Sequence, residues 1–181
     1  MEAGLTVERR LARPLVLVAT LAALAVPLLA AGRVPRPAPE FTILDPGGKQ
    51  IHLSSFKGHV VVIEFLLTNC PHCQRVAQMV GRLDREMSGR FEAIAVAFDN
   101  NLVDPMVTDF SRRLGLSYPI GSSSAIAVDR FLGRGVMERL MVPQIIVIDR
   151  AGVIRAQSHP QGETDLESEV YLRTLIDHLL Q

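Results

Sequence analysis

The two cysteines of this chain, Cys70 and Cys73, enclose Pro71 and His72 and follow a strongly apolar run, His59 to Leu67. A disulfide between them would close a very short loop, for which the chain-entropy model gives only about 2 kcal/mol of stabilisation. A bridge that stabilises so little is better explained as one that opens and closes. The spacing therefore predicts a redox-active dithiol rather than a structural disulfide.

A helix beginning at Pro71 would place the two sulfurs in different environments. Proline fits the first helical position because its missing N–H has no partner there in any case. Cys70 would then be the N-cap, where free N–H groups and the positive end of the helix dipole stabilise a thiolate. We expect Cys70 to be the nucleophile and Cys73 the more buried resolving thiol. A partly protonated His72 would make the disulfide more oxidising, unless it is an exposed residue without a role.

The elements around the cysteines predict a strand, a helix and a second strand. Residues 59–67 are apolar at both odd and even positions, which face opposite sides of a strand, and only Glu64 interrupts the run. This pattern is typical of a strand that is covered on both faces. From Pro71 onward apolar residues recur at helical spacing until Ser88 and Gly89. Residues 91–98 form a second apolar run. The three elements indicate a right-handed parallel crossover.

The remaining segments complete an α/β domain with a central mixed β-sheet flanked by helices. An N-terminal β-hairpin is predicted over 41–53, around the turn 45–48. A mid-domain α/β insertion is expected from a helix over 105–114, a short strand within 116–121 and a helix over 123–133. Two antiparallel strands over 143–149 and 153–158 and an amphipathic helix over 165–181 follow.

The N-terminal region differs from the rest of the chain. Three arginines precede an uncharged apolar run from Pro14 to Gly32, so residues 1–32 are predicted to be a signal peptide or a single membrane anchor. A buried core helix is the alternative. Residues 33–39 carry three prolines and are interpreted as an extended linker before a domain at 40–181. This organisation predicts an extracytoplasmic location, with the N-terminus in or across a membrane.

The charge balance and the small number of possible metal ligands exclude some classes of function. Nineteen basic and nineteen acidic residues cancel, and no basic run is present, so nucleic acid is not an expected partner. Two thiolates with His72 or His159 would form only a partial zinc site, and no second cysteine pair completes it. We therefore expect neither a metal nor another cofactor.

From Pro39 to Gln181 the sequence resembles the thioredoxin superfamily, and within it the TlpA/ResA-like thiol-disulfide oxidoreductases close to the redoxin group. The segments that carry the resemblance are "APEFTILDPGGKQIHLSSFKGHVVVIEF", "NCPHC" and "VPQIIVIDRAGVI". The resemblance implies a thioredoxin fold, a cis Val142–Pro143 bond that shapes a substrate groove, and exchange of disulfides with protein thiols. It also implies a membrane redox partner that recycles the site.

The site departs from the TlpA/ResA-like pattern at several positions. Members commonly have Trp immediately before the first cysteine and Asn six residues before it, where this chain has Asn69 and Glu64. An acid at that position resembles classical thioredoxins and the bacterial disulfide oxidase DsbA, and the CPHC motif and Val142 also resemble DsbA. We expect Glu64 to have a raised pKa and to take the proton from Cys73. A structural ion pair of Glu64 with Lys57 or an arginine is the alternative.

These features leave several functions open. A reductase is expected from the overall resemblance, whereas His72, Glu64 and Val142 favour a DsbA-like oxidant. A peroxiredoxin-like thiol peroxidase would need Thr three residues before its cysteine, but Thr68 is only two before Cys70. A copper chaperone would need a wider cysteine spacing. A non-enzymatic thioredoxin-fold binding domain is the remaining alternative, and the paired cysteines argue against it.

Overall fold

The computed structural model describes residues 33–100, 104–135, 137–162 and 164–181, so the predicted signal or anchor segment 1–32 lies outside the described residues. The strands are β1 (Arg36–Pro37), β2 (Thr42–Leu44), β3 (Gln50–His52), β4 (Val61–Leu66), β5 (Glu92–Ala97), β6 (Ile120–Ser122), β7 (Gln144–Ile148) and β8 (Val153–Gln157). The helices are α1 (Pro71–Met87), α2 (Asp104–Leu114), α3 (Ala125–Leu132) and α4 (Glu169–Leu179), with short 3-10 turns η2 (Leu53–Phe56) and η3 (Asp165–Glu167). These elements confirm the predicted α/β fold.

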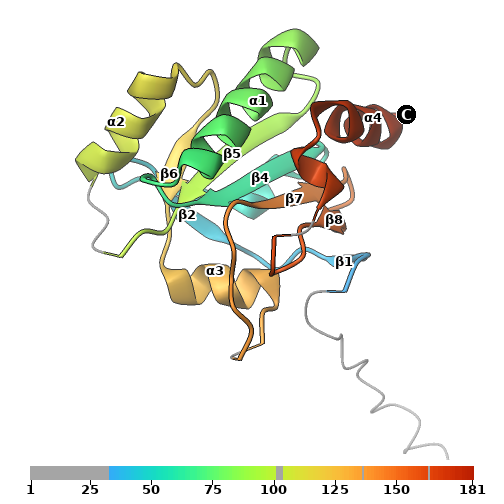
Figure 1. The fold of residues 1–181 in the computed structure, drawn as a ribbon. Helices are drawn as coiled ribbons and strands as arrows, with labels where there is room; N and C mark the ends of the chain where they lie inside the picture. Colours follow the sequence, from blue (N-terminus) through green and yellow to red (C-terminus); the bar gives the residue numbers. More distant parts are fainter. Residues whose placement is uncertain (1–32, 101–103, 136, 163) are drawn as a thin grey trace, which may run out of the picture.

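The described strands form one mixed sheet in the order β1-β8-β7-β4-β5-β6-β2-β3 (Figure 1). Strand β4 lies inside the sheet, parallel to β5 and antiparallel to β7, and every one of its residues is buried. Strand β5 follows β4 through α1, so the predicted parallel strand-helix-strand unit is confirmed. The predicted hairpin is also present as the antiparallel pair β2 and β3.

Helices cover both faces of the sheet (Figure 1). One hydrophobic core contains buried side chains of α1, α2 and α4, and a second contains those of α3 and the hairpin. Alternate β4 residues point to opposite cores: Val62 joins the first, whereas Ile63 and Phe65 join the second. The central strand therefore connects two separate packed layers.

The proline-rich segment before the hairpin is extended, as its prolines favour, but it also adds an edge strand to the sheet. Arg36 lies opposite Ile154 of β8. The Arg36 side chain is buried and donates hydrogen bonds to the carbonyl oxygen of Phe131 and to Oε1 of Gln157. The sequence places the domain start near Glu40, whereas the sheet begins at Arg36. An edge strand tolerates Pro37 because that position needs no N–H donor toward a further strand.

No helix within the described ranges combines the length and the apolar character needed to cross a bilayer.

Candidate redox site

Cys70 and Cys73 occupy the first turn of α1, immediately beyond the carboxyl end of β4. Cys70 has an extended backbone and is the helix N-cap, and Pro71 is the first helical residue, as predicted. The Cys70 sulfur accepts a hydrogen bond from the Cys73 backbone N–H, with an N···S distance of 3.2 Å. Both cysteines are free thiols. The helix end therefore supplies an N–H donor to the sulfur that we expect to be the nucleophile.

The loop before Cys70 is fixed by contacts that the sequence analysis did not identify. Asp99, just after β5, accepts hydrogen bonds from the Thr68 backbone N–H at 2.9 Å and from the Thr68 hydroxyl at 3.0 Å. The Gln74 amide donates to the Thr68 carbonyl oxygen at 3.2 Å. These bonds hold the turn between β4 and α1. Asp99 therefore helps to position Cys70, although it lies about thirty residues further along the chain.

The second sulfur lies in a buried environment. Cys73 has no exposed surface, whereas Cys70 is half-buried, so the predicted difference in exposure is observed. Burial raises the pKa of the Cys73 thiol above its ordinary value, and the nearby negative charges of Cys70 and Glu64 raise it further. Cys73 therefore needs a proton acceptor before it can attack.

Glu64 is fully buried on β4 and faces the same core as Cys73. Its two carboxylate oxygens have no hydrogen-bond partner among the described residues. The structure therefore shows no ion pair with Lys57 or an arginine, the structural alternative considered above. Burial raises the pKa of Glu64 well above its ordinary value, and the negative charges of Cys70 and Glu167 raise it further. A carboxyl group with a raised pKa holds a proton more strongly than usual, so its ionised form is a suitable acceptor for the proton of a nearby thiol.

Val142 and Pro143 lie next to the same end of β4. The pairing of Phe65 with Gln144 sets Pro143 opposite the last residue of β4. The Val142–Pro143 peptide bond is cis, as the resemblance implies. Pro143 is buried, and the half-buried Val142 packs against the core that contains Cys73. The two residues are thus brought to the cysteine end of the sheet.

His72 is exposed on the first turn of α1, but its ring has a partner that the sequence analysis missed. Its Nε2 lies 2.6 Å from Oε2 of Glu167, the last residue of η3. The two residues are far apart in the sequence, and no motif connects them. Within the described parts of the chain, no group of three potential metal ligands is present.

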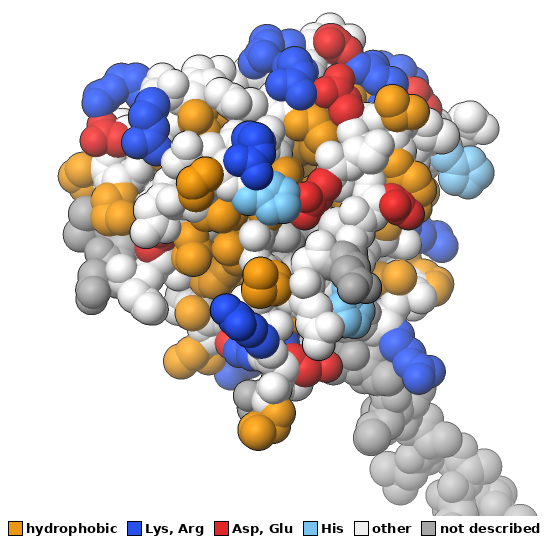
Figure 2. Space-filling model, in the orientation of Figure 1, with side chains coloured by type: hydrophobic (Ala, Val, Ile, Leu, Met, Phe, Trp, Pro, Cys, Tyr) orange, Lys and Arg blue, Asp and Glu red, His pale blue; other side chains and the backbone are white. Residues whose placement is uncertain are grey.

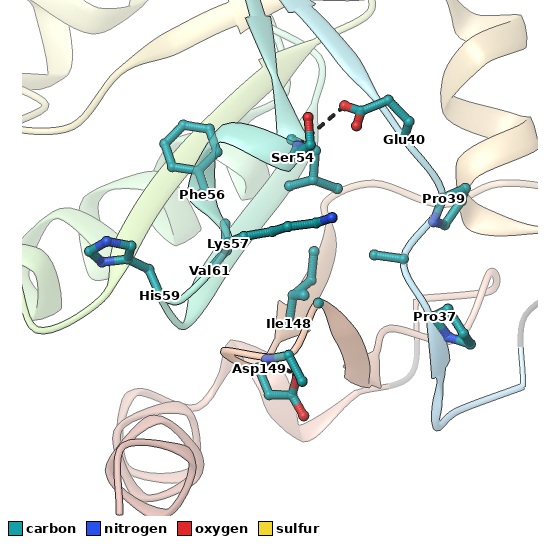
Figure 3. Close-up of a pocket in the computed structure, with 14 residues that line it drawn as sticks. Pro37, Pro39, Glu40, Ser54, Phe56, Lys57, His59, Val61, Ile148 and Asp149 are labelled. Carbon is teal, nitrogen blue, oxygen red and sulfur yellow. Dashed lines mark hydrogen bonds between the residues drawn. The ribbon is translucent and has the colours of Figure 1, made fainter.

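Hydrophobic side chains gather over the N-terminal end of α1 and the segment leading to β7 (Figure 2). A separate cavity of about 360 Å³ lies at the opposite end of β4, lined by residues that include Val61, Ile148, Glu40 and Lys57. Figure 3 shows Lys57 extending across it, with the Glu40 carboxylate bonded to Ser54. It contains neither cysteine, so the dithiol chemistry belongs to the open surface and not to this cavity.

The model of the redoxin family matches residues 33–175. The chain belongs to the redoxin family. Two curated relatives are the thiol-disulfide oxidoreductases ResA of Bacillus thuringiensis (strain Al Hakam), 25% identical over 79% of each chain, and of Bacillus cereus, 25% identical over 76% of each chain. These matches confirm the predicted resemblance to the TlpA/ResA-like thiol-disulfide oxidoreductases of the thioredoxin superfamily.

Solved structures support the thioredoxin fold of this redoxin. A thiol:disulfide interchange protein of Chlorobium tepidum superposes with a TM-score of 0.63 at 23% identity, covering 83% of this chain and all of the other. The thioredoxin domain of a thiol-disulfide oxidoreductase of Bacteroides vulgatus gives a TM-score of 0.61 at 19% identity, covering 82% of this chain and 99% of the other. At these identities the likeness is evidence for the fold alone.

Proposed function

We propose that this redoxin is an exported thiol-disulfide oxidoreductase that exchanges disulfides with protein thiols through Cys70 and Cys73. The observation that carries the proposal is the pairing of a half-exposed N-cap sulfur with a buried second thiol. The helix end stabilises negative charge on Cys70, so this sulfur reacts first. Burial disfavours the thiolate of Cys73, so this sulfur reacts second. This difference is what a two-step exchange requires.

In the reducing direction, the Cys70 thiolate attacks one sulfur of a partner disulfide. A bond forms between Cys70 and that sulfur, and the other partner sulfur leaves as a thiolate. Cys73 then transfers its proton to the Glu64 carboxylate and attacks Cys70, so that a Cys70–Cys73 disulfide forms and the second partner sulfur leaves. Two electrons pass to the partner, whose two sulfurs take up protons. Val142 and Pro143 would contact the partner's backbone beside Cys70.

We favour the reductase direction because it is what the TlpA/ResA-like resemblance of the whole domain implies, and the relatives named ResA match most of this chain. A DsbA-like oxidant is the second candidate, and it is supported by the N–H bond to the Cys70 sulfur, since stabilising the thiolate makes the disulfide more oxidising. A peroxidase is less well supported, because the Thr68 hydroxyl is bonded to Asp99. Equilibration of the full chain with glutathione separates the first two candidates: a potential near about −270 mV indicates a reductant and one near about −120 mV an oxidant.

The exchange itself is tested by trapping. The full chain carrying Cys73→Ser, incubated with oxidised insulin as a generic protein disulfide, should accumulate a mixed disulfide through Cys70. The matched Cys70→Ser variant should accumulate none, because the exposed sulfur has been removed. Absence of the mixed disulfide with Cys73→Ser would refute the proposal and favour a binding domain.

The proposed export depends on residues 1–32, and recycling would require a redox partner in the membrane. The three arginines followed by the uncharged apolar run from Pro14 to Gly32 support export. A fusion of residues 1–39 to a reporter that is active only outside the cytoplasm tests export. A silent reporter would contradict it, and the N-terminal sequence of the mature chain distinguishes a cleaved signal from a retained anchor.

A further inference from the structure

Gln144 is a buried amide at the first position of β7, directly after Pro143. Its side chain has no exposed surface. It lies opposite Phe65 in the sheet, and the alternation of side chains along β7 puts it on the same face as Ile146, on the side of the core that contains α3. A polar group at such a position must find its hydrogen-bond partners inside the protein. Its partners therefore show what the side chain holds in place.

The Gln144 amide nitrogen has two acceptors. Its Nε2 donates to the Met141 carbonyl oxygen at 2.8 Å and to the His159 carbonyl oxygen at 3.1 Å. The reversed amide would place Oε1 against two other acceptors, so the contacts allow only this orientation. Oε1 itself has no hydrogen-bond partner among the described residues. The amide thus bridges the segment before Pro143 and the loop after β8, and it leaves one buried acceptor unpaired.

The two bonds fix a conformation more than they add stability. Met141 and His159 are exposed residues, so their carbonyl oxygens could face water in another arrangement of the two loops. The gain from the two bonds is also offset by the unpaired buried oxygen of the same side chain. Stability alone therefore does not explain a buried glutamine at this position. What the amide provides is one fixed direction for the Met141 carbonyl group, immediately before Val142.

Backbone contacts join the same two segments. They lie side by side (Figure 1), and the Met141 N–H donates to the Pro160 carbonyl oxygen at 2.7 Å. The His159 carbonyl oxygen accepts a second hydrogen bond, from the Gly162 N–H at 2.8 Å. A Cβ atom at Gly162 would lie only 3.2 Å from that of Met141, so glycine permits this close approach. Both backbone polar groups of Met141 are therefore bonded within the protein.

We propose that Gln144 is a positioning residue of the redox site, which fixes the Val142–Pro143 turn against which the backbone of a partner protein lies. The inference rests on the disulfide exchange proposed above, and it adds to that site a residue on the face of the sheet opposite Cys73. Because the Met141 carbonyl group is held inward, the chain enters Val142 in one orientation. A turn without this restraint has to be ordered each time a polypeptide binds, which weakens binding.

A protein disulfide and a small disulfide use the same sulfur but not the same turn. Attack of Cys70 on hydroxyethyl disulfide needs only the thiolate, whereas attack on insulin also brings a polypeptide against Val142 and Pro143. Gln144→Met keeps the length of the side chain but cannot donate a hydrogen bond. Gln144→Asn keeps an amide that is one methylene too short to bridge both carbonyl oxygens. Each variant should therefore react more slowly with insulin but not with the small disulfide.

The experiment measures the second-order rate constant of mixed-disulfide formation in full-length Cys73→Ser chains with Gln144 intact, with Gln144→Met and with Gln144→Asn. With insulin in excess, we expect each Gln144 variant to react about tenfold more slowly, the size of one or two lost hydrogen bonds to the partner. With hydroxyethyl disulfide in excess, the rates should agree within about twofold.

Ser158→Ala in the same background is the matched control. Ser158 is buried, and its hydroxyl oxygen accepts a hydrogen bond from the Ile145 backbone N–H at 2.9 Å, one residue further along β7. The variant removes a buried hydrogen bond at the same end of the strand but leaves the Met141 carbonyl group held. It should lower stability to urea and change neither rate by more than about twofold.

A loss of rate with insulin alone in Gln144→Met supports Gln144 as the positioning residue, and Gln144→Asn decides if Gln144→Met does not fold. No loss, an equal loss with both disulfides, or the same loss with insulin in Ser158→Ala overturns it. Each of these results leaves the proposed exchange intact, because the chain with Gln144 still captures insulin. Failure of that chain to form a mixed disulfide with insulin overturns the proposed exchange and this inference together.

Discussion

Strand β4 sends adjacent side chains into two cores of different character. Phe65 enters the α3-side core, where its ring centroid lies 5.4 Å from that of Phe41 and 5.6 Å from that of Phe131. Glu64 enters the α1-side core, where its carboxylate oxygens have no hydrogen-bond partner among the described residues. Both side chains are fully buried. One residue along the strand therefore separates an aromatic cluster from a buried acid.

The difference shows that the two faces of the sheet contribute differently to stability and to chemistry. Burying aromatic rings in contact is favourable, whereas burying a carboxyl group without partners is costly. The α3-side core can supply stability without carrying chemistry. The α1-side core contains Glu64, the resolving thiol Cys73 and the N-terminal turn of α1, so it tolerates a destabilising residue where the proposed proton transfer needs one.

The largest expected effect is on stability, in the α3-side core. Phe131→Ala removes a ring whose centroid lies 4.9 Å from that of Phe41, and should lower the free energy of unfolding by about 3–5 kcal/mol. The glutathione equilibrium of the folded protein should not change, because no group near the cysteines is altered. Urea unfolding of the dithiol form and glutathione titration measure the two quantities.

Phe131→Leu is the control, with an expected loss below about 1.5 kcal/mol. If Phe131→Ala changed the glutathione equilibrium by more than about threefold, the two cores would not be functionally separate.

The next effect is on rate, in the α1-side core. Glu64→Gln cannot accept a proton, so the attack of Cys73 on the mixed disulfide should slow by about a hundredfold, the lower range for general acid-base catalysis. The first attack by Cys70 should be little affected. Rapid-quench analysis of a single turnover separates the two steps. Glu86→Gln, an exposed acid on α1, is the control, and equal rates for both variants would exclude proton transfer by Glu64.

A smaller effect of Glu64 is a pH dependence of stability. The pKa of Glu64 is higher in the folded protein than in the unfolded chain, where it is about 4.3. At pH values between these two pKa values, the folded protein therefore binds one more proton than the unfolded chain. Stability should therefore fall as pH rises through that window, by about 1.4 kcal/mol for each unit of pKa difference, and then level off. Glu64→Gln should remove this slope and be more stable than wild type above it.

Urea unfolding of wild type and Glu64→Gln across the pH range isolates the contribution, because other groups titrate equally in both. A difference between the two proteins that stays constant with pH would contradict a raised pKa at Glu64.

Local patterns in the sequence predicted the central strand, the helix that follows it and several residues of the site. The apolar run 59–67 and the helical spacing after Pro71 identified β4 and α1 because buried strands and amphipathic helices leave periodic signals. Glu64 stood out as the one charge in its run. The position of Cys70 as the N-cap followed from the single proline after it.

The parts that were missed depend on contacts between distant segments. Glu167 meets His72 across 95 positions of sequence, and Asp99 meets Thr68 across 31. Each is an ordinary acid near a turn, with no local pattern to distinguish it. The edge strand at Arg36 was missed for a related reason, since its pairing with β8 depends on where the sheet ends and not on its own composition.

The smallest expected effect is in the same core as Glu64, at a polar group that does have a partner. The buried Tyr118 hydroxyl donates to the Ala77 carbonyl oxygen of α1 at 3.1 Å. Tyr118→Phe removes this bond but leaves the ring in place, so it should cost about 1 kcal/mol by urea unfolding at neutral pH. Glu64→Gln should have the opposite sign there, because it removes an ionisable group whose charged form is destabilised by burial. If both variants were destabilised equally, it would be wrong that the Tyr118 hydroxyl stabilises the α1-side core and the Glu64 carboxyl group destabilises it.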